Sequence, residues 1–229
     1  MDQAWIKTFL MHGKTYLFNQ RLEKTRNFIK NKLSIYKKPY IAYSGGKDST
    51  VMIHLMIQEN SDIHVLHWDY GPYLVPRNIE EKIIENAKQI GVKNLLVLTS
   101  NLYIKLKRNL KNVWGSEFMD KELPKLRDKG FDCSFIGLRS EESCKRKSKT
   151  RYKQGRDKYM DNIYPLTDWT YKDIYAYLLK FNVPYLKEHY DKYGKVLGYK
   201  NARFVTFFDP DFPENRALDG LLMWKFKNM

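Results

Sequence analysis

Residues 40–136 alternate between short β-prone runs and longer helical runs, and this alternation constrains the fold more than any other feature of the chain. The strand-like runs are residues 40–44, 62–71, 94–100 and 132–137. The helix-like runs between the first three are residues 48–60 and 76–91, the second of which ends at Gly91. Strands that alternate with helices typically form a parallel sheet covered by helices. We therefore expect an α/β fold of three layers, with a parallel sheet of about five strands.

The segments on either side of this alternation predict three parts. Residues 1–37 form an N-terminal helical segment, with a helix at 17–35, and residues 38–158 form the α/β core. Residues 101–130 are expected to be less regularly helical, with Pro124 interrupting. Residues 159–229 are expected to form a small, mainly helical C-terminal extension packed on one edge of the sheet. In that extension, Thr170 and Asp173 have the spacing of a capping box at a helix start.

The composition excludes a disordered chain and favours an anionic partner. Hydrophobic residues make up 43% of the chain and aromatic residues 15%, so a sizeable core can form. The formal net charge is +15, which is typical of proteins that bind nucleic acid, nucleotides or anionic surfaces. Residues 145–158 concentrate this charge, with Tyr152 and Tyr159 among the basic residues. A solvated basic face is the alternative interpretation.

The cysteines and the N-terminus predict a cytoplasmic protein. The chain has two cysteines, Cys133 and Cys144, and they form neither a zinc motif nor a disulfide framework. Free thiols are typical of a reducing compartment. The first residues lack the apolar run of a secretory signal, and no run approaches the roughly 18 apolar residues of a membrane span.

The stretch "YIAYSGGKDSTVMIHLM" (residues 40–56) joins the first strand to the first core helix and predicts a phosphate site. Gly45 and Gly46 permit backbone conformations that bring N–H groups close to an anion. The start of the helix adds partial positive charge, and Lys47 adds a full one. Ser44, Ser49 and Thr50 are hydroxyl donors. The Walker A spacing is absent, and the alternative is a tight turn with an incidental lysine.

The string "SGGKDS" resembles the pyrophosphate-binding loop of the adenine nucleotide α-hydrolase superfamily, whose members are called PP-loop ATP pyrophosphatases. The chain is similar in particular to the phosphoadenylylsulfate (PAPS) reductase branch. Asp69 in "WDYG" matches an acidic residue of that branch, and residues 164–185 are similar to its helical segment with proline, tryptophan and aspartate. A third segment, "GLRSEESCKR", supplies Gly137, Arg139, Glu142, Ser143 and Arg146.

The resemblance implies cleavage of ATP between its α- and β-phosphates, with Mg²⁺, to adenylate an acceptor. It implies catalytic roles for Lys47, Arg139 and Arg146, because cations can contact the phosphates. Asp69 is the candidate ligand of the metal or of a ribose hydroxyl, and Asp48 is expected to cap the helix. The implied nucleotide-binding residues are Ser44, Gly45, Gly46, Lys47, Asp48, Ser49, Asp69, Gly137, Arg139 and Ser143.

The chain departs from the PAPS reductase pattern near its C-terminal end. Reductases of that branch use a C-terminal cysteine as nucleophile, and related sulfur-transfer enzymes carry several, often for an iron–sulfur cluster. Here no cysteine follows Cys144, and Arg203 precedes Phe, Val, Thr and Phe. Reduction needs a thiolate, so we expect neither reductase chemistry nor a cluster. Cys133 is expected in the core, and Cys144 lies among basic residues that could lower its pKa.

Three hypotheses about function stay open. The first is an adenylating enzyme that acts on nucleic acid or works with a separate sulfur donor protein. The second is a PAPS or adenylylsulfate reductase that uses Cys144 or a partner's thiol. The third is a nucleotide- or nucleic-acid-binding subunit without catalysis. No general base is identified, since His54, His64, His67 and His189 are each expected to be structural. The oligomeric state stays open, with a homodimer as one alternative.

Overall fold

The computed structural model describes residues 1–72, 75–101 and 117–202, and these residues form an α/β fold around a six-stranded sheet. The strands are β1 (Pro39–Tyr43), β2 (His64–Asp69), β3 (Asn94–Thr99), β4 (Cys133–Ile136), β5 (Gln154–Arg156) and β6 (Asp161–Ile163). The helices are α1 (Gln3–His12), α2 (Tyr16–Leu33), α3 (Lys47–Glu59), α4 (Arg77–Ile90), η1 (Phe118–Glu122), α7 (Leu123–Asp128), η2 (Ser140–Glu142), α8 (Cys144–Thr150), α9 (Tyr171–Lys180) and α10 (Lys187–Leu197).

The sheet is parallel except at one edge. Its strand order is β3-β2-β1-β4-β6-β5, and only β5 pairs in the antiparallel sense, with β6. The chain runs outward from β1 through β2 to β3, then returns to the other side of β1 as β4. The order therefore reverses between β1 and β4, and open α/β sheets bind ligands in the crevice at such a switch point, beyond the carboxyl ends of the strands.

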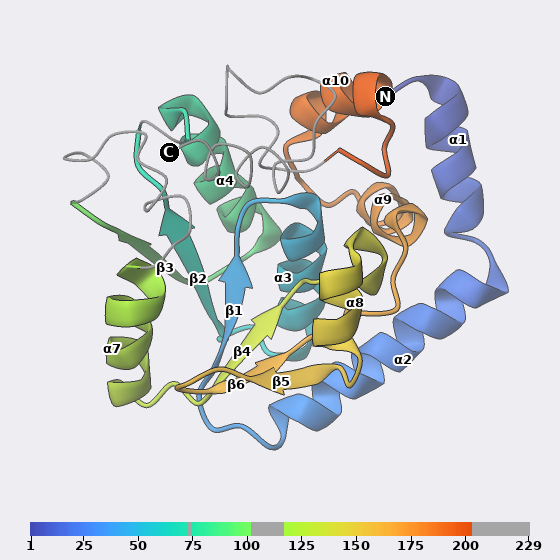
Figure 1. The fold of residues 1–229 in the computed structure, drawn as a ribbon. Coiled ribbons are helices and arrows are strands. Elements are labelled where there is room, and N and C mark those ends of the chain that lie inside the picture. The colour runs from blue at the N-terminus through green and yellow to red at the C-terminus, as the bar shows by residue number, and fades with distance from the viewer. Residues whose placement is uncertain (73–74, 102–116, 203–229) are drawn as a thin grey trace.

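The alternation of side chains along the strands explains why helices cover both faces of the sheet. Ile41, Tyr43 and Val65 point into the larger buried cluster, where α3, α4 and α9 pack. Tyr40 and Leu66, one residue away in each strand, point to the opposite face, where they meet Leu123 and Leu126 of α7. Figure 1 shows α3 and α7 on either side of this sheet.

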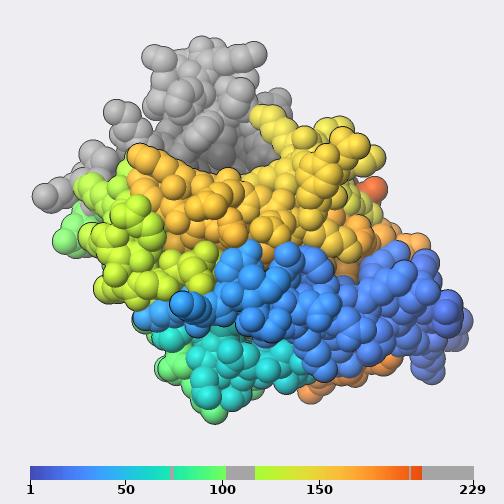
Figure 2. Space-filling view, turned by 90° about the horizontal axis from the view of Figure 1, so that it is seen from below, coloured from blue at the N-terminus to red at the C-terminus, as the bar shows by residue number. Residues whose placement is uncertain are grey.

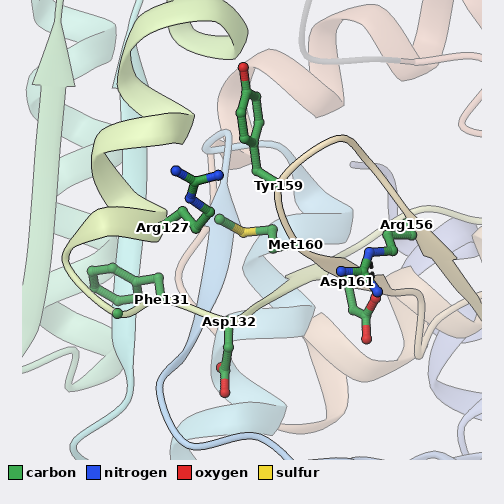
Figure 3. Close-up of a pocket in the computed structure, with 8 residues that line it drawn as sticks. Arg127, Phe131, Asp132, Arg156, Tyr159, Met160 and Asp161 are labelled. Carbon is green, nitrogen blue, oxygen red and sulfur yellow. Dashed lines mark ion pairs between the residues drawn. The ribbon is translucent and has the colours of Figure 1, made fainter.

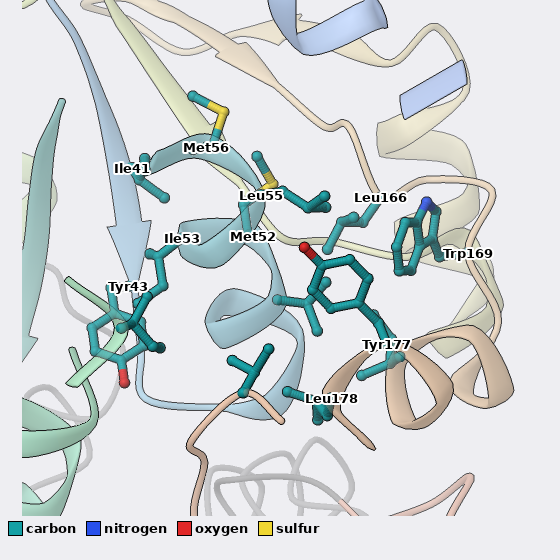
Figure 4. Close-up of a cluster of buried hydrophobic side chains, with 14 of the residues drawn as sticks. Ile41, Tyr43, Met52, Ile53, Leu55, Met56, Leu166, Trp169, Tyr177 and Leu178 are labelled. Carbon is teal, nitrogen blue, oxygen red and sulfur yellow. The ribbon is translucent and has the colours of Figure 1, made fainter. Parts of the chain in front are cut away.

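The larger cluster joins segments that lie far apart in the chain. Figure 4 shows Met52 and Met56 of α3 with Trp169 and Tyr177 of the C-terminal part. Aromatic contacts extend this cluster to the N-terminal helix, since Phe9 stacks on Tyr175 with a centroid distance of 4.9 Å. Helix α1 and helix α9 therefore pack on each other as well as on the core of the sheet.

The face seen from below carries α7, the β5–β6 hairpin and α8 (Figure 2). A cleft of about 320 Å³ lies there between α7 and the hairpin (Figure 3). Its lining comes from the residues that precede β4 and from the turn that joins β5 to β6. This cleft is at the amino ends of the parallel strands, so it is opposite to the edge where β1 leads into α3.

The observed elements confirm the expected α/β class and extend it. The strands and helices expected between residues 40 and 100 are present, and Gly91 ends α4 with a left-handed φ of 98°. The capping box of Thr170 and Asp173 is confirmed. The sheet has six strands instead of about five because residues 154–163 add an edge hairpin, so the sheet extends beyond residue 158. The expected irregular helix of residues 101–130 lies partly outside the described residues; in the described part, the π-helix η1 passes directly into α7, and Pro124 lies in the first turn after this change.

Candidate active site

The loop between β1 and α3 is shaped by its two glycines. Gly45 has φ of 76°, and a Cβ there would lie 2.5 Å from Cγ1 of Ile83 on α4, so only glycine fits without displacement. Gly46 takes an extended conformation and is the N-cap residue of α3. The glycine pair therefore allows the chain to turn from strand to helix directly beneath α4.

Hydroxyl groups hold this turn in place. Ser49 and Thr50 both donate from their hydroxyls to the carbonyl oxygen of Gly46, at 2.9 Å each. The N–H of Ser44 donates to Oγ of Ser49 at 3.2 Å. Ser49 and Thr50 are buried, whereas Ser44 is exposed. The hydroxyl of Ser44 also lies 3.1 Å from Oγ of Ser49 and accepts from the N–H of Gly46 at 3.4 Å, so all three predicted hydroxyl donors order the loop, and Ser44 is the one exposed to solvent.

Backbone N–H groups at the start of α3 are available to an anion. Within the residues that the structure describes, the N–H groups of Gly45, Asp48 and Ser49 donate no hydrogen bond. That of Lys47 donates to the hydroxyl of Tyr190 on α10, at 3.0 Å. Unpartnered N–H groups at the N-terminus of a 13-residue helix form a site for a phosphate group.

Lys47 is buried, with 1% of its surface exposed, and its ammonium group faces the protein. Its Nζ donates to the carbonyl oxygen of Ala202 at 2.9 Å and lies 3.2 Å from Oδ2 of Asp48. It also lies 5.2 Å from the ring centroid of Tyr190. Burial lowers the pKa of Lys47 below its ordinary value, although Asp48 acts in the opposite direction. The lysine is at the predicted loop, and the segment that ends at Ala202 covers it.

Asp48 pairs with Arg139 instead of capping α3. Arg139, which is 1% exposed, donates from Nε to Oδ1 of Asp48 and from Nη1 to Oε2 of Glu141 at 2.7 Å. The expectation of a cap is wrong, because α3 has no side-chain cap and the aspartate turns toward the arginine. Burial opposes the charge on Asp48, but Arg139 and Lys47 outweigh it and lower its pKa to about 2.

Gly137 makes this pairing possible. It follows β4, and a Cβ there would lie 3.0 Å from the carbonyl oxygen of Asp48. The backbone after β4 therefore approaches the first turn of α3 as closely as a glycine allows. Burial opposes the charge on Arg139 as well, yet Asp48, Glu142 and Glu141 outweigh it and raise the pKa of Arg139.

The remaining residues of the predicted arginine motif extend this network outward. Arg146, which is partly exposed, donates from Nη1 to Oε2 of Glu142. Ser143 caps α8 by accepting from the N–H of Arg146 at 3.2 Å. A chain of charges therefore runs from Asp48 through Arg139 and Glu142 to Arg146. The structure brings together every member of the motif, and Gly137 and Arg139 join it to Asp48 of the loop.

Asp69 lies at the carboxyl end of β2 and binds an arginine. Arg77 contacts both of its oxygens at 2.8 Å, and the N–H of Gly71 donates to Oδ1 at 2.7 Å. Burial alone would raise the pKa of Asp69, but Arg77 and Gly71 outweigh it and lower that pKa. No group of three metal-ligating side chains occurs among the described residues. The donor set therefore does not fit a resident Mg²⁺, since a guanidinium already occupies the one candidate ligand.

His67 and Cys133 lie in the core and contact the protein. His67 contacts the carbonyl oxygen of Tyr43 at 2.8 Å and Glu80 at 2.7 Å, and both contacts are buried. Cys133 is buried in β4, and burial raises the pKa of its thiol. Cys144 is exposed at the start of α8. Arg203 lies outside the described residues.

The sequence did not identify Tyr190, the carbonyl oxygen of Ala202, Glu141 or Arg77 as parts of the site. Tyr190 and Ala202 meet the loop across more than 140 residues of chain, and no local pattern marks such a contact. Arg77 is eight positions after Asp69 in a helix start, where a basic residue has no distinguishing context. A sequence signal existed only for Glu141, which lies inside the arginine motif.

The comparisons agree with this geometry. Residues 38–203 match the model of the phosphoadenosine phosphosulfate reductase domain, so the chain belongs to that family. A phosphoadenosine 5'-phosphosulfate reductase of Alkalilimnicola ehrlichii is 26% identical over 63% of this chain and 62% of its own length. An uncharacterized protein of Methanocaldococcus jannaschii is 29% identical over 74% of this chain and 37% of its own length. The chain thus spans less than two thirds of these curated relatives.

Solved structures show the same fold at low sequence identity. The PAPS reductase of Candida auris, titled as a phosphate complex, has a TM-score of 0.53 at 16% identity and covers 82% of this chain and 91% of its own. The NAD synthetase of Campylobacter jejuni has a TM-score of 0.55 at 14% identity, and the match covers 92% of this chain and 94% of the synthetase. The chain therefore shares its fold with these two proteins. Among the described helices, none has the length and apolar character needed to cross a bilayer.

Proposed function

We propose that this protein binds ATP at residues 44–49 and cleaves it between the α- and β-phosphates to adenylate an acceptor. The observation that carries the proposal is the set of unpartnered N–H groups at the start of α3, on Gly45, Asp48 and Ser49. They lie next to the switch point of a parallel sheet, where ligands bind in folds of this kind. The family match supports a nucleotide as the ligand.

In this mechanism the loop stabilises the leaving group. An oxygen of the acceptor attacks the α-phosphorus, a new P–O bond forms, and the bond from that phosphorus to the bridging oxygen breaks. The electron pair leaves with pyrophosphate, whose added charge the N–H groups and the dipole of α3 stabilise. Mg²⁺ would enter with the nucleotide and be held by phosphate oxygens, as is usual for this ion.

The buried position of Lys47 adds a condition to the mechanism. Its ammonium group now contacts Ala202 and Asp48, so a phosphate reaches Nζ only after residues 198–202 shift. A charge that is desolvated in the free protein and gains a phosphate on binding would favour that shift. Arg139 is held by carboxylates and acts on this scheme as the group that positions Asp48 and the first turn of α3.

The thiols within these 229 residues give little support to reduction as the activity. The relatives include a reductase and a sulfate adenylyltransferase subunit of a Mycobacterium, which is 26% identical over 62% of this chain and 55% of its own length. The chain has only two cysteines, of which one is buried in the sheet. A nucleophile that attacks sulfur must be an accessible thiolate, which leaves Cys144 or a partner's thiol.

The test is the release of pyrophosphate from ATP·Mg²⁺ with a panel of acceptors. We expect wild-type protein to release pyrophosphate and the Lys47→Ala variant to release it at least tenfold more slowly. Lys88→Ala, which alters an exposed lysine of α4, is the matched control and should behave as wild type. Because Lys47→Ala removes a buried group, Ser44→Ala at the exposed hydroxyl is a second variant, with an expected loss of several-fold.

The outcomes separate the three hypotheses. Binding of ATP without pyrophosphate release under any acceptor would overturn the proposal in favour of a non-catalytic subunit. Release of sulfite from labelled PAPS, with a thiol as reductant, would overturn it in favour of a reductase. If that sulfite release persisted in Cys144→Ala, the reducing thiol would belong to a partner.

A further inference from the structure

Exposed cations without carboxylate partners line one edge of the molecule. They belong to α8 and to the β5–β6 hairpin, and we call them the basic track: Lys145, Lys147, Lys149, Arg151 and Lys158. Within the residues that the structure describes, none of these five forms an ion pair with a carboxylate. Their charges are therefore available to a partner.

Exposed lysines without a carboxylate partner among the described residues also occur elsewhere, as at Lys7, Lys14 and Lys88, and the track differs from them by gathering its cations within residues 145–158. By contrast, Lys121 of η1 pairs with Glu117 at 3.0 Å, and Lys125 of α7 pairs with Glu122 at 2.7 Å. Arg146 on the inner side of α8 pairs with Glu142. Unpaired cations of one sign in one place raise the local potential and cost self-repulsion, so a partner of opposite charge would stabilise them.

Aromatic rings lie among these cations. Tyr152 follows α8 with 79% of its surface exposed, and the guanidinium of Arg151 lies 5.6 Å from its ring centroid. Tyr159 lies in the hairpin turn, 5.3 Å from Nζ of Lys158 and 5.7 Å from the guanidinium of Arg127. Rings beside cations suit a ligand that has both phosphates and flat bases.

The track leads from the active-site edge of the sheet to the cleft at the opposite edge. Strand β5 runs antiparallel to β6, so α8 begins near the carboxyl ends of the parallel strands and β5 ends at the cleft. Figure 2 shows α8 and the hairpin on one face, continuous with α7. In the cleft, Arg127 lies on the α7 side, and Arg156 and Tyr159 belong to the hairpin side (Figure 3).

The two carboxylates of the cleft are held by the protein, and Asp161 also lies 3.9 Å from Nε of Arg156. Asp132 accepts from the N–H groups of Lys37 and Lys38 at 2.7 and 3.1 Å. Asp161 accepts from the hydroxyl of Tyr36 at 3.0 Å.

We propose that the basic track binds the phosphodiester backbone of a nucleic acid and that this polymer is the acceptor that the enzyme activates. The role of the nucleic acid as acceptor rests on the proposed function. Its binding to the basic track does not depend on that function. An anionic membrane fits less well, since α8 has no apolar face: its uncharged residues are Cys144, Ser148 and Thr150. The nearest exposed ring, that of Tyr152, suits stacking on a base.

Arg146, which lies beside the basic track on the inner side of α8, provides a connection between nucleic-acid binding and the active site. Arg146 begins the chain of ion pairs that passes through Glu142 and Arg139 to Asp48 in the loop. A phosphate that draws Arg146 away from Glu142 would alter the charge that faces Arg139. Acceptor binding and the order of the phosphate loop are therefore coupled through contacts that the structure contains.

The experiment measures binding of the full chain to labelled single-stranded RNA, single-stranded DNA and duplex DNA over a range of salt. We compare Lys147→Gln/Lys149→Gln/Arg151→Gln with Lys7→Gln/Lys14→Gln/Lys88→Gln, which removes three exposed lysines elsewhere and changes the net charge equally. We expect the track variant to bind at least tenfold more weakly at 100 mM salt. Its log–log salt slope should fall by about 2, because each lost phosphate contact contributes roughly 0.7 to 0.9.

A second pair of variants tests stacking. Tyr152→Ala should weaken binding to single strands about tenfold, whereas Tyr152→Phe, which keeps the ring, should bind as wild type. The three nucleic acids identify whether RNA or DNA is the ligand. Absence of salt-dependent binding to all three, equal losses in both triple variants, or a preference for phosphatidylserine vesicles would each overturn the inference.

A third measurement separates this inference from the proposed function. The nucleic acid that binds is added to ATP·Mg²⁺ and pyrophosphate release is followed. Release that the track variant loses and the control keeps supports the nucleic acid as acceptor. Binding without any stimulation of release overturns its role as acceptor while the track remains a binding surface, and release with another acceptor shows that the proposed function survives.

Discussion

The phosphate loop and the basic track both contain cations, but the protein uses them in opposite ways. At the loop, Lys47 and Arg139 are 1% exposed, and carboxylates and a carbonyl oxygen surround them. On the track, Lys145, Lys147 and Arg151 are exposed and have no carboxylate partner in the described part of the chain. The first set of charges holds the fold together, and the second faces solvent.

This difference shows that a basic residue can either stabilise the fold through ion pairs or bind an external anion, and that the two roles can compete. A buried cation must be neutralised in the free protein, because an unpaired charge in the interior costs several kcal/mol. An exposed cation stays hydrated, so its charge costs little free energy without a partner, and it remains free to bind an anion. The predictions below change one side of this comparison at a time, in order of expected effect on stability.

The largest effect is expected from Arg139→Ala. It leaves the largely buried Asp48 with Lys47 as its remaining described cation, and removal of one member of a buried ion pair costs about 3–5 kcal/mol. Arg146→Ala, which alters a partly exposed member of the same network, should cost no more than about 1 kcal/mol. Urea unfolding of the two variants measures both values, and equal losses would contradict the distinction between buried and exposed charges.

Gly45→Ala should be the next most destabilising change. The residue has φ of 76°, and the new methyl group would lie 2.5 Å from Ile83, so strain and overpacking together cost about 3 kcal/mol. Gly91→Ala is the matched control, since its φ is 98° but its nearest neighbour is 3.9 Å away, and about 1 kcal/mol is expected. Thermal unfolding of both variants would show whether packing against α4 adds to the backbone strain.

Acid should lower the free energy of unfolding because Asp48 becomes protonated. The pKa of this carboxyl is about 2 in the folded protein, below its ordinary value near 4. Its contribution is therefore fully present above pH 4 and is lost as the pH falls from about 4 to 2, with a total on the order of 2 kcal/mol. In Asp48→Asn this part of the pH dependence should disappear, and urea unfolding at a series of pH values from 5 to 2 measures it.

The smallest effect on stability is expected on the track. Lys147→Gln/Lys149→Gln/Arg151→Gln removes exposed charges without carboxylate partners among the described residues, so unfolding should change by less than about 0.5 kcal/mol. A loss above 1 kcal/mol would show that these cations hold the fold, as Arg139 does. The same protein serves the nucleic-acid measurements, so folding and binding are compared on one sample.

The sequence predicted the fold well where a local pattern existed. Alternation of apolar runs placed the central strands and helices, and the glycine pair before Lys47 placed the turn between β1 and α3. It did not predict the edge hairpin, because β5 is only three residues long and lies in a basic segment without alternation. Strands that short are stabilised by their neighbours and leave almost no signal of their own.

The sequence by itself determined that glycines, hydroxyls and a lysine occur together between a strand and a helix, and that a basic segment follows the fourth strand of the alternation. Only the tertiary structure decided which atoms these groups face. Asp48 accepts a hydrogen bond from Arg139 instead of capping α3, and Lys47 donates to the carbonyl oxygen of Ala202. Both contacts exist because the residues after β4 and the residues around Ala202 pack against the start of α3. Contacts across 91 and 155 residues set the surroundings of each charge, and burial then sets whether that charge is paired or available.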